Sequence, residues 1–314
     1  MASSSTAAYL SGNEYGKRHV RLLKVTRKEG GGEEQVRDLN VRVLLQGEGL
    51  DASYLTGDNS AVVPTDTVKN TIYVLAKKDP ITHIETFGVR LVQHFLEEYS
   101  HIHTVEAYIE EQLWERLVVA GQPHSHSFAP RREVRTALIS SSKGAAGLDA
   151  GPRPIQVVSG LRNLELLKTS GSGFVGFHKD RYTTLPEVKD RLLRTQVEAT
   201  WTYNAPPHQI DFTAVWNGVV RNTCRLFAER YSRSVQETVY AIGDAVLKDF
   251  VHVQSISFTL PNIHNWTVDL TRFGLQHEWS NEILTPVSEP QGLIKGTITR
   301  PSSSGSCPAH AARL

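Results

Sequence analysis

The sequence predicts an α+β protein made of two copies of one domain, each with the element order ββααββ and antiparallel strands. Three observations support this fold class. Blocks of sequence recur in the two halves, and strand-like and helix-like segments come in groups instead of alternating one by one. The composition, with 39% hydrophobic and 21% charged residues, is that of a globular protein. A chain of 314 residues also has the length expected of two domains.

Two blocks of sequence recur. Residues 67–73 (TVKNTIY) resemble residues 234–240 (SVQETVY), at an offset of 234 − 67 = 167 residues. Residues 99–105 (YSHIHTV) resemble residues 250–256 (FVHVQSI), at an offset of 250 − 99 = 151 residues. Because both blocks keep their order, we interpret them as traces of a duplication, and their spacing is too long for a solenoid repeat.

The Gly/Ala/Pro-rich stretch 143–154 is the expected boundary between the copies. The predicted organisation is a flexible N-terminus (1–13), a first copy (14–145), a second copy (155–300) and a flexible tail (301–314).

In the first copy, β-branched and alternating residues predict strands at 20–26, 36–45, 101–119 and 133–140. Helical spacing predicts helices through 68–75 and 87–96. Thr65 and Asp66 have side chains that can cap the first of these helices. In the second copy we expect strands at 155–168, 195–203, 252–260 and 293–299, and helices at 211–231 and 235–250.

Charge and composition exclude several classes of function. The chain has 34 Lys and Arg against 33 Asp and Glu. It therefore lacks the excess of basic residues that is typical of a dedicated nucleic-acid binder. No apolar run reaches the roughly 18 residues of a membrane span, and no secretory signal is recognisable. Cys224 and Cys307 are too few for a disulfide framework or a cysteine-based zinc site. We therefore expect a soluble, intracellular protein.

One long motif points to a family. Residues 164–185 read LELLKTSGSGFVGFHKDRYTTL and are followed by Arg191, a spacing that closely resembles the signature of the urate oxidase (uricase) family. The only departure within it is Ser170, where the family usually has Thr. Other blocks that match the family, in order, are 15–17, 63–66, 123–128, 234–236, 260–264 and 288–294.

The resemblance implies a fold and a reaction. The fold is a tandem T-fold (tunnelling fold), in which four chains assemble into a barrel with sites at interfaces between chains. The reaction is the oxidation of urate by O2 and water to 5-hydroxyisourate and hydrogen peroxide, the first step of urate degradation towards allantoin, without metal or organic cofactor.

The resemblance also implies a substrate-binding set of Phe174, Arg191, Val235 and Gln236. The residue types fit a flat anion with a polar edge. A guanidinium is a planar, charged fork, a side-chain amide both donates and accepts, and a phenyl ring offers a face for stacking. By itself, a single Arg is usually a solvated surface residue and a single Phe is usually part of a core.

Lys17, Thr65 and His264 match the family's proton relay. A Lys with a lowered pKa could draw the proton from a Thr hydroxyl, and His can transfer protons near neutral pH. Asn262 would hold O2 or water above the ring, and Asp66 would contact the substrate or fix the loop from the neighbouring chain. Without the resemblance, helix capping alone would explain Thr65 and Asp66, and exposure would explain Lys17.

Two histidine pairs suggest a metal site instead. His101 and His103, and likewise His124 and His126, are spaced i, i+2. No carboxylate–His spacing completes a metal motif, so we expect hydrogen bonding at these positions and no catalytic metal. The triplet 30–32 (GGG) lacks the strand–helix context of a dinucleotide fingerprint.

Other readings remain open at this stage. One is another tunnelling-fold enzyme acting on purines or pterins, such as a hydrolase or aldolase, and a different class is a non-catalytic peroxisomal assembly protein. The last three residues, Ala312-Arg313-Leu314, fit the small–basic–Leu pattern of a peroxisomal targeting signal read by an import receptor. They predict a peroxisomal location.

Overall fold

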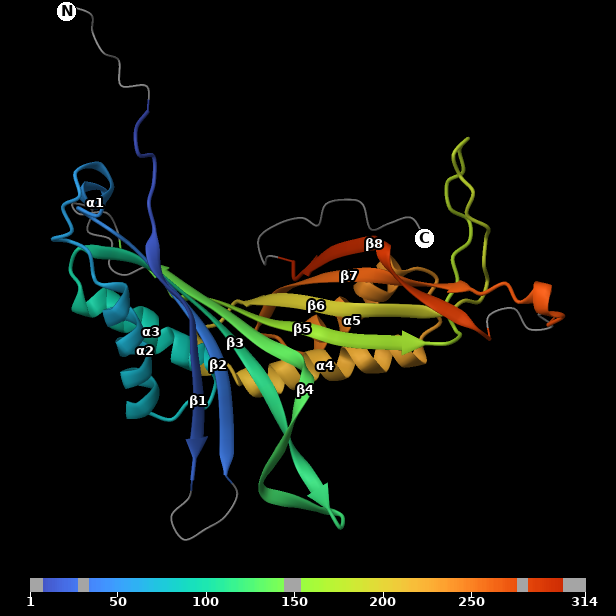
Figure 1. The fold of residues 1–314 in the computed structure, drawn as a ribbon, viewed down its shortest axis with the longest axis horizontal. Coiled ribbons are helices and arrows are strands. Elements are labelled where there is room, and N and C mark those ends of the chain that lie inside the picture. Colours follow the sequence, from blue (N-terminus) through green and yellow to red (C-terminus); the bar gives the residue numbers. More distant parts are fainter. Residues whose placement is uncertain (1–7, 28–33, 144–153, 276–281, 302–314) are drawn as a thin grey trace, which may run out of the picture. The chain divides into compact units, whose positions relative to one another are not determined.

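The structure, a computed structural model, describes residues 8–27, 34–143, 154–275 and 282–301. It divides into two compact units (Figure 1). The first unit is Met1–Ser159 with Pro206–His208, and the second is Gly160–Ala205 with Gln209–Leu314. The N-terminus, glycine triplet, copy boundary and tail named above lie wholly or largely outside the described residues, as do Cys307 and the C-terminal tripeptide.

The first unit is an antiparallel sheet in the strand order β1-β2-β3-β4, with α2 and α3 packed on one face (Figure 1). Alternate residues of β2, such as Leu39, Val41 and Val43, are fully buried on that face. The elements are β1 (Tyr15–Thr26), β2 (Gln35–Gly47), α1 (Asp51–Leu55), α2 (Thr65–Lys78), α3 (Ile84–Glu98), β3 (Ile102–Val119) and β4 (Gln122–Ser142).

The second unit repeats this design with the strand order β5-β6-β7-β8 and with α5 packed on β7 and β8. Its core contains Trp201 of β6 and Phe258 of β7. The elements are β5 (Gln156–Lys168), β6 (Leu193–Tyr203), α4 (Phe212–Glu229), α5 (Val235–Asp249), β7 (Val253–Thr267) and β8 (Leu284–Thr299). Short 3₁₀ helices follow β6 and β7, namely η1 (Pro207–Gln209) and η2 (Thr271–Phe273). The predicted fold class, two antiparallel ββααββ copies, is confirmed.

The structure supports one of the two repeat blocks and contradicts the other. The offset of 151 residues relates α3 to α5 end to end, because 235 − 84 and 249 − 98 both equal 151. The offset of 167 residues is wrong, because it aligns α2, the first long helix of its unit, with α5, the second. Short helical segments share apolar spacing whatever their place in the fold, which explains the false match.

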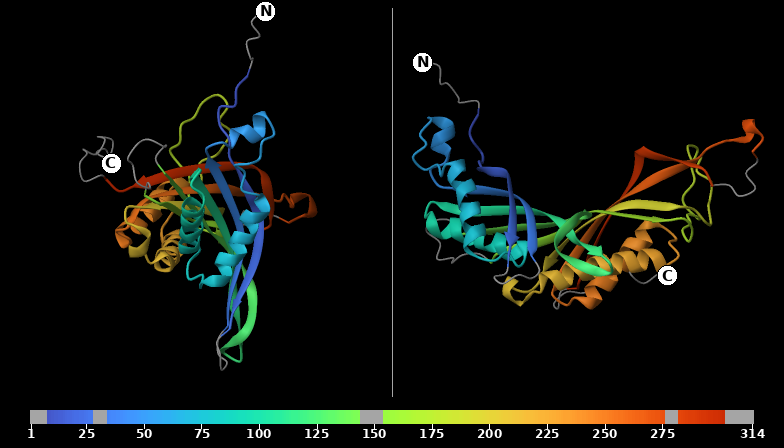
Figure 2. Two further views of the ribbon diagram at one scale, coloured as in Figure 1. Left: turned by 90° about the vertical axis from the view of Figure 1, so that its left-hand side faces the viewer. Right: turned by 60° about the horizontal axis from the view of Figure 1, so that its bottom comes forward.

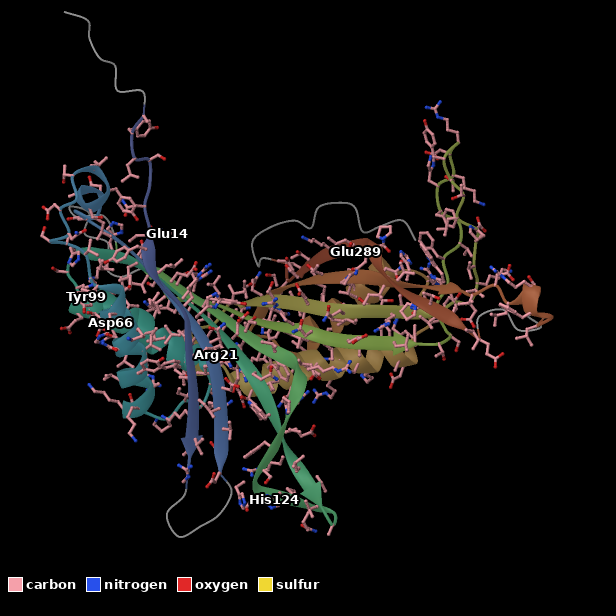
Figure 3. All side chains as sticks on the ribbon, viewed as in Figure 1. Glu14, Arg21, Asp66, Tyr99, His124 and Glu289 are labelled. Atoms are coloured by element: carbon pink, nitrogen blue, oxygen red, sulfur yellow. The ribbon has the colours of Figure 1, made fainter. Side chains whose placement is uncertain are left out.

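Several strands are longer than predicted. β1 begins at Tyr15, not at Val20, and β4 begins at Gln122, directly after a two-residue turn at Ala120 and Gly121. Both turn residues have positive φ (50° and 76°), as a tight hairpin requires. The outer parts of β3 and β4 extend past α2 and α3 as an arm (Figure 2), and Figure 3 places His124 near its end. Both faces of β4 are largely exposed at residues 122–132, so no alternation of buried and exposed side chains marks this part as a strand.

Among the described residues, no helix combines the length and the apolar character needed to cross a membrane.

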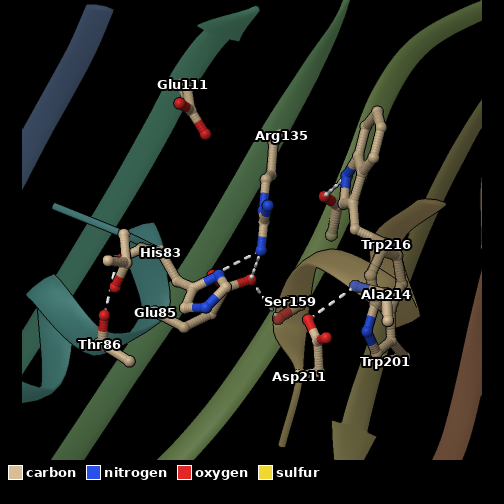
Figure 4. A network of polar contacts seen from close by, with 12 residues as sticks. His83, Glu85, Thr86, Glu111, Arg135, Ser159, Trp201, Asp211, Ala214 and Trp216 are labelled. Atoms are coloured by element: carbon tan, nitrogen blue, oxygen red, sulfur yellow. Dashed lines mark hydrogen bonds and ion pairs between the residues drawn. The ribbon is translucent and has the colours of Figure 1, made fainter. Parts of the chain in front are cut away.

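A buried ion pair lies in the core of the first unit (Figure 4). Arg135 of β4 donates to both carboxylate oxygens of Glu85, at 3.1 and 2.8 Å, and Ser159 donates to one of them at 2.7 Å. Glu85 is completely buried and Arg135 is 4% exposed. Removing one partner of such a pair leaves a charge without compensation inside the protein.

We therefore expect Arg135→Met to lower the free energy of unfolding by about 3–5 kcal/mol, measured by urea unfolding. Lys248→Met, which breaks an exposed pair with Asp244, is the control and should leave the free energy of unfolding nearly unchanged. The double variant Glu85→Gln/Arg135→Met should recover part of the loss. A loss no larger than that of the control would contradict the role of this pair.

Candidate active site

The predicted site residues fall into two groups, one in each unit. We call Lys17, Thr65 and Asp66 the first half-site. The second half-site consists of Phe174, Arg191, Val235, Gln236, Asn262 and His264.

Lys17 lies where β1 departs from regular pairing. The register with β2 shifts between Lys17 and Val20, and His19 between them has a φ of 58°. Gly16 precedes the irregularity, and a Cβ added to it would lie far inside van der Waals contact with the carbonyl of Val43. Close backbone approach therefore requires glycine beside Lys17.

Tyr15 connects β1 to the segment that leads into α2. Its hydroxyl oxygen accepts a hydrogen bond from the backbone N–H of Val63 at 2.7 Å. Burial raises the pKa of Tyr15, which keeps the phenol neutral. This contact fixes the strand bearing Lys17 against the segment that ends at Thr65.

Thr65 and Asp66 are the first two residues of α2. The prediction that they cap this helix is wrong, because Pro64 occupies the N-cap position and both residues are already helical. Asp66 instead accepts hydrogen bonds from Lys69 and from Asn70, the latter at 2.9 Å. The bond from Lys69 is the main cause that lowers the pKa of Asp66, and the charge of Lys17 adds to it. Figure 3 shows Asp66 on the outer side of α2.

Phe174 and Arg191 lie together in the loop between β5 and β6. Phe174 and Val188 exchange backbone hydrogen bonds of 2.7 and 3.1 Å, which close the base of this loop. The ring of Phe177 stacks on that of Phe174, with centroids 4.9 Å apart. The guanidinium of Arg191 lies 5.4 Å from the centroid of the Phe174 ring.

The Arg191 side chain has a buried donor that is open to a ligand. Its backbone N–H donates to Ser172 at 2.7 Å, which fixes the main chain. Its side-chain Nε is buried and has no hydrogen-bond partner in the part of the chain that the structure describes. Burial lowers the pKa of the Arg191 guanidinium, so the charge is held in a partly desolvated place. Such a group is ready to bind an anion.

The start of α5 is held beside the same loop. Ser232 donates its backbone N–H to Gly171 and accepts from that of Gly173, both at 2.9 Å. Two residues later, Ser234 caps α5 by accepting from the N–H of Glu237 at 3.1 Å.

Val235 and Gln236 are the first two residues of α5, and Gln236 is exposed. The first N–H groups of a helix have no acceptor within the helix. Together with the Gln236 amide, they therefore offer donors to a ligand at this end of α5.

Asn262 and His264 follow each other at i, i+2 on β7, so their side chains point to the same face of the sheet. Both are partly buried. Asn262 pairs with Thr195 of β6, and His264 pairs with Val287 of β8, where the register shifts. An amide and an imidazole thus follow the buried stretch of β7 that ends at Leu260.

The histidine pairs make local hydrogen bonds. His101 Nε2 lies 2.8 Å from the carbonyl of Ala61, and His103 Nδ1 lies 3.3 Å from Thr104 Oγ1. The rings of His124 and His126 meet edge to face with centroids 4.5 Å apart. Within the described residues, no group of three or more His, Cys, Asp or Glu is arranged to hold a metal ion.

Sequence reasoning assigned no role to several residues that shape the site. Asp190 accepts from the N–H of Gly171 at 2.7 Å, and Ser172 and Ser232 supply the backbone contacts described above. Tyr15 belongs to the motif 15–17 that resembles the family, but nothing in the sequence was a reason to assign it a role. Short polar residues near Gly are common in loops, so only the folded chain reveals these partners.

Two tandem ββααββ units, each with its long helices on one face of an antiparallel sheet, define a protein of the tunnelling-fold class. The model of the family described as Uricase matches residues 13–140 and 157–295. The chain belongs to the uricase family.

Known uricases are similar to this chain over almost its whole length. The Uricase of Dictyostelium discoideum is 41% identical over 298 residues, covering 94% of this chain and 99% of that protein. The Uricase of Aspergillus flavus is 39% identical over 298 residues, covering 92% and 96%. The crystal structure of uricase from Arthrobacter globiformis matches with a TM-score of 0.84 at 36% identity, covering 96% and 99%.

The close approach at Gly16 gives a test of the first half-site. We expect Gly16→Ala to push β1 away from β2 and to lower the free energy of unfolding by about 1–3 kcal/mol, the usual cost of overpacking. Gly12→Ala is the matched control, because a Cβ there would meet no atom within 4 Å. Thermal unfolding of the two variants measures the difference, and equal melting temperatures would show that Gly16 is not constrained.

Proposed function

We infer that the protein is a urate oxidase that oxidises urate with O2 and water to 5-hydroxyisourate and hydrogen peroxide. Membership of the uricase family supports this function. The observation in the structure that carries it is the pair formed by Phe174 and Arg191, an aromatic face beside a partly buried cation whose Nε has no protein partner among the described residues.

Urate suits this pair because it is flat, anionic at neutral pH, and edged with carbonyl and N–H groups. The ring of Phe174 would stack on the heterocycle, and the Arg191 fork would bind one polar edge. The amide of Gln236 and the backbone N–H of Val235 would bind another edge from the start of α5. Binding therefore uses an aromatic face, one positive charge and a helix N-terminus.

The reaction transfers two electrons from urate to O2. Water adds a hydroxyl group to the ring, and O2 leaves as hydrogen peroxide with two protons, so that atoms and charge balance. We assign proton transfer to Lys17, Thr65 and His264, in which Lys17 would draw the Thr65 proton and make urate a more electron-rich dianion. Asn262 would hold O2 or water above the ring, and Asp66 would contact the substrate or fix its loop. The proposed reaction uses no metal or organic cofactor.

We further propose that four chains assemble and that each site combines the first half-site of one chain with the second half-site of another. The resemblance to the family supports this arrangement. The proposed location is the peroxisome, with Ala312-Arg313-Leu314 as the signal for an import receptor; these residues lie outside the described part of the chain.

Purified protein should consume urate and O2 together and release hydrogen peroxide, with a chelator present throughout. Loss of the ultraviolet absorbance of urate, an O2 electrode and a peroxide assay follow the three species in parallel. If none of the three changes, the proposed function is wrong. If activity depends on an added metal, another tunnelling-fold enzyme becomes the better explanation.

Replacing Arg191 by Lys keeps the charge but removes the planar fork. We expect Arg191→Lys to weaken urate binding by at least one charged hydrogen bond, about 1.5–3 kcal/mol. Equilibrium binding of urate under anaerobic conditions separates affinity from turnover. Arg181→Lys is the control, because Arg181 lies over the exposed ring of Tyr182 in the same loop and outside the half-site. Unchanged affinity in Arg191→Lys would remove Arg191 from the site.

A further inference from the structure

Polar side chains connect the two chain segments that form most of the second half-site. One segment is the loop that carries Phe174 and Arg191. The other is the start of α5, which carries Gln236. These segments are distant in sequence, so their contacts decide how they can meet a single substrate molecule.

Lys168, the last residue of β5, reaches across to the second segment. Its Nζ donates to Ser232 Oγ at 2.8 Å and to the carbonyl of Arg230 at 3.0 Å, and it lies 5.3 Å from the ring of Phe227. Burial lowers the pKa of Lys168, although the charge of Glu237 opposes this effect. The ammonium group is half-buried, and its two hydrogen bonds link the end of β5 to the segment that leads into α5.

Ser232 is hydrogen-bonded both to the loop and to α5. It is completely buried, and its backbone pairs with Gly171 and Gly173 of the loop. Its Oγ also lies 2.9 Å from the hydroxyl of Thr238, in the first turns of α5, and that hydroxyl is 3.0 Å from the carbonyl of Ser234. Hydrogen bonds therefore run from the end of β5 through Ser232 into the cap of α5.

Tight packing supports the same point. A Cβ added to Gly173 would overlap the hydroxyl of Tyr231, which itself donates to the carbonyl of Lys189. Gly173 therefore lies close to Tyr231, in the segment that leads into α5, and the hydrogen bonds of Ser232 hold the loop to that segment.

We propose that Lys168 and Ser232 are positioning residues for substrate binding, because their hydrogen bond sets the spacing between the Phe174–Arg191 pair and Gln236. This inference rests on the proposed function, since it names residues that prepare the same site. Neither residue touches the substrate; each acts through the loop and the helix. We call this pair of residues the Lys168–Ser232 clamp.

Lys168→Met keeps the length of the side chain but removes the donor. The KM for urate should rise about tenfold, which is one lost contact of about 1.4 kcal/mol, and should change more than kcat. Lys168→Arg retains a donor and should restore most of the affinity. Lys248→Met removes an exposed lysine elsewhere in the second unit and should leave both constants unchanged.

Ser232→Ala provides a second, smaller change that the fold should accept. Ser232→Ala and Lys168→Met both remove the hydrogen bond between the two residues, so the KM of the double variant should rise by clearly less than the product of the two single effects. Fully additive effects, or a KM equal to that of the unchanged protein while the melting temperature falls, would overturn the proposal.

A readout without urate separates this proposal from the proposed function. Hydrogen exchange at the backbone amides of Gly173 and Phe174 should become about tenfold faster in Lys168→Met and stay unchanged in Lys248→Met. If the unchanged protein does not oxidise urate but this acceleration occurs, the function is wrong and the clamp stands. Unchanged exchange in Lys168→Met would overturn the clamp whatever the activity.

Discussion

The second half-site depends on one short backbone contact, the pairing of Ser232 with Gly171 and Gly173. Through it, the loop with Phe174 and Arg191 is anchored to the residues that begin α5. Within the loop, Phe174 pairs with Val188 and Arg191 donates to Ser172, and the hydroxyl of Tyr231 donates to the carbonyl of Lys189. An aromatic face, a cation and a helix N-terminus can act on one flat ligand only if their spacing is fixed before the ligand arrives.

The two copies use the same helix position in opposite ways. The offset of 151 residues places Glu85 of α3 opposite Gln236 of α5, since 236 − 85 = 151. Glu85 is buried and bound to Arg135 and Ser159, so its carboxylate belongs to the core of its unit. Gln236 is exposed and carries no charge that the fold must neutralise. The second copy thus keeps this position available to a ligand, whereas the first copy uses it for stability.

The fold class was predictable because burial of one sheet face imposes alternation, as in Leu39, Val41 and Val43 of β2. The β3 half of the arm was predicted, but the outer part of β4, residues 122–132, was not, because a strand exposed on both faces carries no such pattern. Thr65 and Asp66 have the chemistry of capping residues, but Pro64 precedes them with a fixed φ and takes the N-cap position. Propensity could not reveal that one-residue difference.

The predicted site residues came from the resemblance, and single residues such as Arg191 or Gln236 would have attracted no attention alone. The roles of Lys168 and Ser232 could not be predicted, because the two residues are 64 positions apart and no spacing pattern links them. Their relation follows from the fold, in which the end of β5 meets the start of α5. Supporting contacts of this kind are set by tertiary structure and leave little trace in local sequence.

The central claim is that two incomplete half-sites, contributed by different chains, form one urate site. The most direct measurement mixes inactive Thr65→Val with inactive Arg191→Ala under conditions in which subunits exchange, with exchange followed by native mass spectrometry. Random mixing should restore about a quarter of the activity of the unchanged protein, because half of the paired chains are mixed and each mixed pair has one intact site of two. Persistent inactivity despite complete exchange would contradict the account and place the site within a single chain.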